Sequence, residues 1–95
     1  SWAVASDVGV TEYSVVFARS ARRDLERLEV GVARRIVARI EALAANPRPP
    51  GCVKLQGADD LWRIRVGEYR VIYSIDNNAR IVDITAVRHR SDAYR

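Results

Sequence analysis

Along residues 62–73 (WRIRVGEYRVIY), hydrophobic and polar side chains alternate. Successive side chains of a strand point to opposite faces, so this pattern predicts two strands with one apolar face and one face that carries arginines. Gly67 and Glu68 fit a two-residue hairpin turn, because glycine readily takes the positive φ that such a turn needs. That turn places Arg65 opposite Arg70 across the predicted hairpin.

The opposed Arg65 and Arg70 indicate an anion site. Like charges at paired positions destabilise a sheet by roughly 0.2–1 kcal/mol. A chain that keeps such a pair is expected to use it, and phosphate is the obvious anion for a pair of guanidinium groups. Arg63 falls on the same predicted face and enlarges the basic surface.

The preceding part of the chain changes from strand to helix periodicity. Residues 12–17 (EYSVVF) are β-branched and aromatic and predict a first strand. Apolar positions at helical spacing then predict two helices. The first is short and has Ser20 as its N-cap, and the second begins after Gly31 and ends at Asn46, which precedes a proline. Together these segments read as a helical hairpin.

The remaining elements complete a sheet. Residues 53–55 are expected to begin it, and a turn at residues 77–78 leads to a return strand at 81–87. With that turn, Arg70 pairs with Thr85. The resulting β-α-α-β-β-β order predicts an α+β fold, a small antiparallel sheet with the helical hairpin packed on one face. The other face, which carries the arginines, stays open.

Composition is consistent with one small domain over residues 1–95, with 1–11 expected to be a loosely ordered leader. A hydrophobic content of 48% excludes wholesale disorder, and a net charge of +4 with a pI near 9.8 indicates an acidic partner. Fifteen of the sixteen basic residues are arginine. Arginine suits bidentate binding of phosphate, but coding bias explains such a composition equally well, so only the placement of particular arginines decides.

Several classes of site and location are excluded. One cysteine and one histidine form neither a disulfide within the chain nor a four-ligand zinc site. The acidic residues near the arginines (Glu68, Asp83 and Asp92) lack the paired spacing of two-metal sites. We therefore expect no metal and no cofactor. No apolar run approaches the roughly 20 residues of a membrane span and no secretory signal is evident, which predicts a cytoplasmic protein without a membrane partner.

Six segments carry a resemblance to a known family. In chain order they are YSVVF (13–17), ARRDL (21–25), NP (46–47), KLQG (54–57), LWRIRVGEYRVIY (61–73) and RHRSDAY (88–94). Together they cover nearly the whole chain from about residue 12, and the chain resembles the RelE/ParE family of bacterial and archaeal toxins, more specifically its RelE branch. The resemblance implies cleavage of mRNA in the ribosomal A site, so the ribosome and mRNA are expected partners. It also implies an acidic, RelB-like antitoxin that wraps the toxin, with operator DNA bound only through their complex.

The resemblance also implies roles for individual residues. It assigns catalysis to Arg65, Arg70, Arg90 and Tyr94, and it matches Arg63 to the family's basic pair. The residues expected to bind RNA or phosphate are Arg63, Lys54, Arg88 and His89. In such a reaction the neighbouring 2′-OH attacks phosphorus without a metal, while arginines stabilise the charge on the phosphoryl oxygens. Tyr94 is the candidate general base, because surrounding guanidinium groups would lower its pKa. Either Arg90 or His89 is the candidate donor of a proton to the leaving 5′-oxygen.

Two other functions stay open at this level. Members of the ParE branch poison DNA gyrase, and such a toxin does not require the set formed by Arg70, Arg90 and Tyr94. A noncatalytic RNA-binding domain would use the basic strands alone. Aromatic stacking platforms are typical of such domains, yet Trp62 and Tyr69 fall on the predicted core face.

Overall fold

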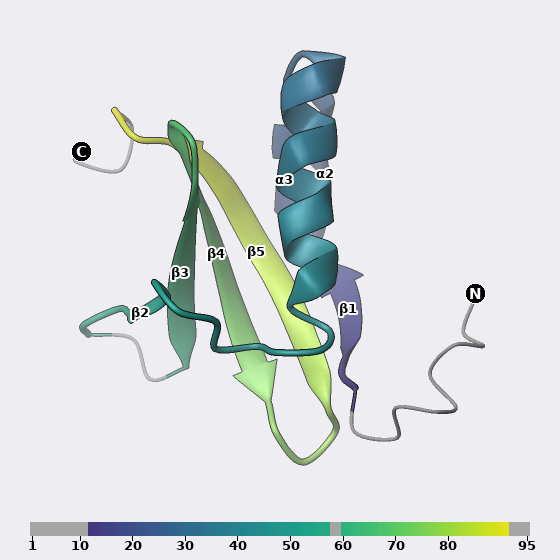
Figure 1. Ribbon diagram of the computed structural model, residues 1–95, viewed down its shortest axis with the longest axis vertical. Helices are drawn as coiled ribbons and strands as arrows, with labels where there is room; N and C mark the ends of the chain where they lie inside the picture. Colours follow the sequence, from purple (N-terminus) through teal and green to yellow (C-terminus); the bar gives the residue numbers. More distant parts are fainter. Residues whose placement is uncertain (1–11, 58–59, 92–95) are drawn as a thin grey trace.

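The computed structural model describes residues 12–57 and 60–91, which form a five-stranded sheet with two helices on one face (Figure 1). The expected leader at 1–11 lies outside the described residues. The elements in chain order are β1 (Ser14–Phe17), α2 (Arg19–Glu26), α3 (Val30–Ala42), β2 (Val53–Lys54), β3 (Leu61–Val66), β4 (Tyr69–Asp76) and β5 (Ile81–His89). The predicted α+β fold, with a helical hairpin packed on one face of a sheet, is confirmed.

The sequence predicted an antiparallel sheet, and this part of the prediction is wrong because the sheet is mixed. Its strand order is β1-β5-β4-β3-β2, and β1 runs parallel to β5 while the other neighbours are antiparallel. The helices carry the chain from β1 at one edge to β2 at the other (Figure 1). The neighbour of β1 is therefore β5, the last strand of the chain. The sequence of residues 12–17 does not predict this pairing.

The core lies between the sheet and the helices. From α3, the predicted apolar stripe contributes Ile36 and Ile40, which are fully buried, and Leu43 follows just after the helix. Burying one such side chain stabilises the fold by roughly 1.5–3 kcal/mol. The sheet contributes an apolar row, of which alternation predicted Ile64, Val66, Val71, Tyr73, Val82 and Ile84. Ile75 and Val87 complete the row. Among the described residues, neither helix is long and apolar enough to cross a membrane.

Both helices begin earlier than predicted. The N-cap of α2 is Ala18, and Ser20 instead lies inside the helix, where its Oγ donates a hydrogen bond to the backbone oxygen of Thr85 at 2.7 Å. A bond across the fold has replaced the local cap expected from the sequence. Gly31 does not separate the helices but lies in the first turn of α3, whose N-cap is Glu29.

The two hairpins differ in how well alternation predicted them. The β3–β4 register is as predicted, with Arg65 opposite Arg70 and Gly67 at a φ of 61°. The β4–β5 register is not, because the loop spans residues 77–80 instead of 77–78 alone. A bulge follows between the pairs Tyr73–Ile84 and Ile72–Ala86. As a result, Arg70 pairs with Arg88, and the predicted pairing with Thr85 is wrong.

Candidate functional site

A row of arginines crosses three neighbouring strands on the open face of the sheet. Arg65 of β3 pairs with Arg70 of β4, which in turn pairs with Arg88 of β5. We call these three residues the arginine row. Paired residues of an antiparallel sheet point to the same face, and adjacent strands lie about 4.8 Å apart. Three guanidinium side chains therefore leave one face within roughly 10 Å along the sheet.

The row combines exposed and sheltered positions. Arg65 and Arg88 are exposed at its ends, whereas Arg70 is half-buried between them. Arg63 lies two residues before Arg65 on the same face of β3 and pairs with Ile72. The helices cover the opposite face of the sheet (Figure 1). The open face therefore keeps its exposed basic groups accessible to a large anionic ligand. Guanidinium groups arranged in this way suit several oxygens of one phosphate or of adjacent phosphates.

Arg88 is among the residues expected to bind RNA or phosphate, but alternation along the sequence did not place it beside Arg70. The bulge inserts one extra residue, Thr85, into β5, so that every later residue of the strand changes face. A signal was present in the sequence, because Ala86 and Val87 are adjacent apolar residues that interrupt the alternation of this strand. Val87 accordingly lies in the core, 5% exposed, and Arg88 lies on the open face.

Arg90 lies at the end of the sheet beside the β3–β4 turn. Its backbone N–H donates to the oxygen of Glu68 at 2.7 Å, which continues the pairing beyond β5. The Arg90 Nη1 also lies 3.7 Å from the Glu68 Oε1, but both side chains are more than half exposed, so this ion pair contributes little to stability. Tyr94, the expected general base, lies outside the described residues.

His89 and Lys54 do not join the arginine row. His89 pairs with Tyr69, whose ring it meets edge to face with the centroids 5.2 Å apart, on the face that carries the helices. The backbone N–H of Ser91 donates to its Nδ1 at 3.2 Å, which leaves Nε2 as the protonated nitrogen of the neutral ring. Lys54 pairs with Trp62 and therefore also points away from the open face.

The chemistry available on the open face is mainly that of cations. Besides the arginines, β4 and β5 place Ser74 and Asp83 there as a cross-strand pair. Within residues 12–57 and 60–91, no group of three or more histidine, cysteine or acidic side chains could hold a metal ion. The described part of this face can thus bind and orient a phosphodiester and stabilise added negative charge on it.

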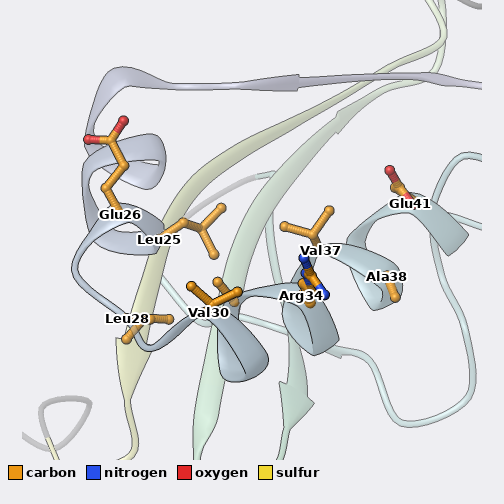
Figure 2. A pocket seen from close by; sticks show the side chains of 9 residues that line it. Leu25, Glu26, Leu28, Val30, Arg34, Val37, Ala38 and Glu41 are labelled. Carbon is orange, nitrogen blue, oxygen red and sulfur yellow. The ribbon is translucent and has the colours of Figure 1, made fainter.

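A groove lies between α2 and α3, on the side of the molecule away from the arginine row (Figure 2). It encloses about 400 Å³, and its lining is mostly apolar, including Leu25, Leu28 and Val37. Glu26, Arg34 and Glu41 are the charged residues of its lining. Among the described residues that line it, none is a histidine, serine or cysteine.

Comparisons with known proteins agree on one family. The sequence profile of the ParE toxin of type II toxin-antitoxin systems, parDE, matches residues 15–94. The toxin RelE of Mycobacterium tuberculosis is 34% identical over 84 residues, which are 87% of this chain and 87% of that protein. The archaeal RelE-RelB complex from Pyrococcus horikoshii superposes with a TM-score of 0.74 at 30% identity, covering 83% of this chain and 96% of that one. The RelBE2 complex of Mycobacterium tuberculosis also gives a TM-score of 0.74, at 31% identity and 83% and 99% coverage.

Proposed function

Since this chain belongs to the RelE/ParE family of toxins of type II toxin–antitoxin systems, we propose that it is an endoribonuclease that cleaves mRNA in the ribosomal A site. The observation that carries the proposal is the arginine row, with Arg65, Arg70 and Arg88 in successive pairs across β3, β4 and β5. A face of this kind binds the RNA backbone and can stabilise the charge that develops on a phosphate during cleavage. The site of action is the cytoplasm, where mRNA is translated.

In the proposed reaction the 2′-OH next to the scissile bond attacks phosphorus, and the bond to the 5′-oxygen breaks. Arg70 is the residue best placed to hold the phosphoryl oxygens, because it is central in the row and half-buried. Tyr94 takes the proton of the 2′-OH. Arg90 donates a proton to the leaving 5′-oxygen, since it directly follows β5 at the end of the sheet that carries Arg88, whereas His89 meets the Tyr69 ring on the opposite face.

The ribosome is part of the proposed active assembly. The described part of the open face has cations but no histidine, so it does not by itself present a matched pair of general acid and general base. Binding in the A site would hold the 2′-OH in line with the leaving oxygen, which supplies much of the barrier reduction through orientation. Cleavage therefore needs assembled ribosomes and needs no catalytic metal ion.

The proposed regulator is an acidic, RelB-like antitoxin. The similar structure from Pyrococcus horikoshii is a RelE-RelB complex, and that from Mycobacterium tuberculosis is the toxin-antitoxin complex RelBE2. A disordered segment rich in aspartate and glutamate could fold onto the open face, neutralise the arginine row and block access of mRNA. Operator DNA would be bound through that complex and not by the toxin alone.

Primer extension on mRNA, after induction of the toxin in cells, tests the proposal. We expect cuts within translated codons for wild type, and their loss in Arg70→Gln. The matched control is Arg34→Gln, which removes the same charge from α3 on the other side of the molecule and leaves the cuts in place. With purified components, cleavage should persist in EDTA when polyamines keep ribosomes assembled, and naked RNA should stay intact.

A gyrase poison is the second candidate, because the matching profile is that of the ParE toxin. The same experiment separates the two. Intact mRNA together with an SOS response would overturn the ribonuclease proposal in favour of gyrase. Efficient cutting of free RNA by the purified toxin would contradict the proposed dependence on the ribosome.

A further inference from the structure

The β5 bulge lies where the strand loses its neighbour on one side. β1 accompanies β5 only from Ile81 to Ile84, and in the described chain α2 follows directly after β1. The outer edge of β5 beyond Ile84 therefore presents backbone polar groups with no strand beside them. A polar group in such a half-buried place needs another partner.

Two side chains of α2 supply these partners. The Oγ of Ser20 donates to the Thr85 backbone oxygen at 2.7 Å, and the Oδ2 of Asp24 accepts from the Val87 backbone N–H at 3.0 Å. Ser20 and Asp24 are four residues apart, so they lie on the same side of the helix. Their two bonds bracket Ala86, directly at the bulge. On the inner side, the Thr85 Oγ1 donates to the Ile72 oxygen at 3.0 Å.

Asp24 is poorly suited to its position by local rules alone. It lies in the last turn of α2, where the helix dipole disfavours an acidic side chain. Ser20 likewise has a low helix propensity and does not cap the helix. Residues that break local rules are expected to serve the tertiary structure, and here both bond the same strand.

The face on which Arg88 lies depends on that bulge. In a regular strand that continued from the Tyr73–Ile84 pair, Val87 would pair with Arg70, and Arg88 would point to the helix side. With Thr85 as the extra residue, Val87 enters the core and Arg88 pairs with Arg70. We infer that Asp24 and Ser20 are positioning residues for the arginine row, because they hold the bulge that turns Arg88 onto the open face. This inference rests on the proposed function of the row.

The test uses the full chain with Asp24→Ala, Asp24→Asn and Glu26→Ala. Asparagine keeps an oxygen that can accept from Val87, and Glu26→Ala removes an equal charge from the same helix without touching β5. In Asp24→Ala we expect faster hydrogen exchange of the Val87 amide and loss of the nuclear Overhauser contact between Arg70 and Arg88. Cleavage on ribosomes should fall about 10- to 100-fold, mainly in kcat, as expected for a misplaced group. Asp24→Asn should restore most of each property, and Glu26→Ala should resemble wild type.

The two structural readouts separate this inference from the proposed function. If wild type does not cut mRNA, the function fails, while the Val87 amide and the Arg70–Arg88 contact still decide whether Asp24 holds the register. An Asp24→Ala protein with wild-type exchange and contact would overturn the inference, as would a lost contact with unchanged cleavage in an active enzyme. If Asp24→Ala does not fold, Ser20→Ala replaces it, since alanine favours the helix. An unchanged Arg70–Arg88 contact in Ser20→Ala would then overturn the inference.

Discussion

At the scale of single residues, the role proposed for Arg70 conflicts with the stability of the sheet. Arg70 lies on β4 and pairs with an arginine on each neighbouring strand, Arg65 on β3 and Arg88 on β5. Each like-charge pair costs roughly 0.2–1 kcal/mol in a sheet. Such a cost is expected at functional sites, where selection for activity overrides local stability.

Replacing Arg70 with threonine should raise stability and abolish activity. Threonine favours strands, and the change relieves repulsion with both neighbours, so the melting temperature should rise by several degrees. Thermal unfolding measures the change in melting temperature. Arg63→Thr is the control, because Arg63 pairs with Ile72 and its replacement relieves no repulsion between paired charges. The melting temperature of wild type should also be higher in phosphate than in chloride at equal ionic strength. This difference should be larger for wild type than for Arg70→Thr. A lower melting temperature with an unchanged phosphate response would mean that Arg70 is a structural residue.

Tyr73 illustrates the opposite case, a polar group used only for the fold. Its side chain is fully buried, and its hydroxyl donates to the Pro47 oxygen at 2.7 Å, which ties the loop after α3 to β4. Burial raises the pKa of Tyr73 far above its usual value, so the phenol stays neutral and keeps donating throughout the physiological range. A group whose neutral form is favoured by folding contributes stability that is fully present below its ordinary pKa of about 10 and is lost as the pH rises from there through the raised pKa.

Tyr73→Phe should lower the free energy of unfolding by about 1–3 kcal/mol, because the Pro47 oxygen loses its buried donor. Urea unfolding near pH 7 measures the change. Tyr13→Phe is the matched control, since the Tyr13 hydroxyl donates to Asn77 at an exposed site and should contribute much less. Equal losses of unfolding free energy in the two variants would show that the buried Tyr73 hydrogen bond contributes no more stability than the exposed Tyr13 bond.

At the scale of elements, two glycines occupy very different backbones. Gly31 lies in the first turn of α3, where a Cβ would come no closer than 3.4 Å to another heavy atom, the Glu29 Oε1. Gly67 lies in the β3–β4 turn at a φ of 61°, and a Cβ there would lie 3.1 Å from an Arg35 nitrogen. Helix geometry thus tolerates a side chain at the first glycine, and the turn needs glycine at the second.

Alanine at these two positions should therefore have opposite effects. Gly31→Ala should stabilise the protein by about 0.4–1 kcal/mol, because it reduces the entropy of the unfolded chain and favours the helix. Gly67→Ala should destabilise it by about 1 kcal/mol or more, since the turn forces a positive φ. Denaturant midpoints of the two variants give the comparison. If Gly67→Ala were as stable as wild type, the turn would not depend on glycine.

At the scale of the whole molecule, the fold separates two kinds of surface. The helices cover one face of the sheet (Figure 1). They enclose its apolar row, while the arginine row lies on the other face. The net charge of +4 favours association with nucleic acid in general, but it does not locate the contact. If the arginine row is the contact, as proposed, binding should depend on its three arginines more than on those of the helices.

The salt dependence of RNA binding measures how many phosphates the arginine row contacts. If the row contacts three phosphates, the logarithm of the association constant for single-stranded RNA should fall with the logarithm of the salt concentration with a slope of about −2. Arg88→Gln should reduce the steepness of this slope by about 0.7, and Arg34→Gln should leave it unchanged. Fluorescence anisotropy with a labelled oligonucleotide over about 50–200 mM salt is suitable. Equal effects of the two variants would indicate diffuse binding to net charge.

Local patterns in the sequence determined the elements, the core face and the first hairpin. Alternation in residues 62–73 and glycine at 67 suffice to oppose Arg65 and Arg70, because strand periodicity and a tight turn leave one register. The apolar stripe of α3 determined how it packs in the same way. The resemblance to RelE/ParE toxins also rested on residues visible in the chain, and the family is confirmed.

Tertiary structure alone decided the neighbour of β1, the register of β5 and thereby the face of Arg88. The pairing of β1 with β5 joins segments more than 60 residues apart, and no local pattern encodes such a contact. Ser20 and Asp24 read as helix residues of no special importance until α2 lies against β5 and they bond its backbone. Because side chains change face every residue, one inserted residue moved His89 away from the arginines and brought Arg88 to them.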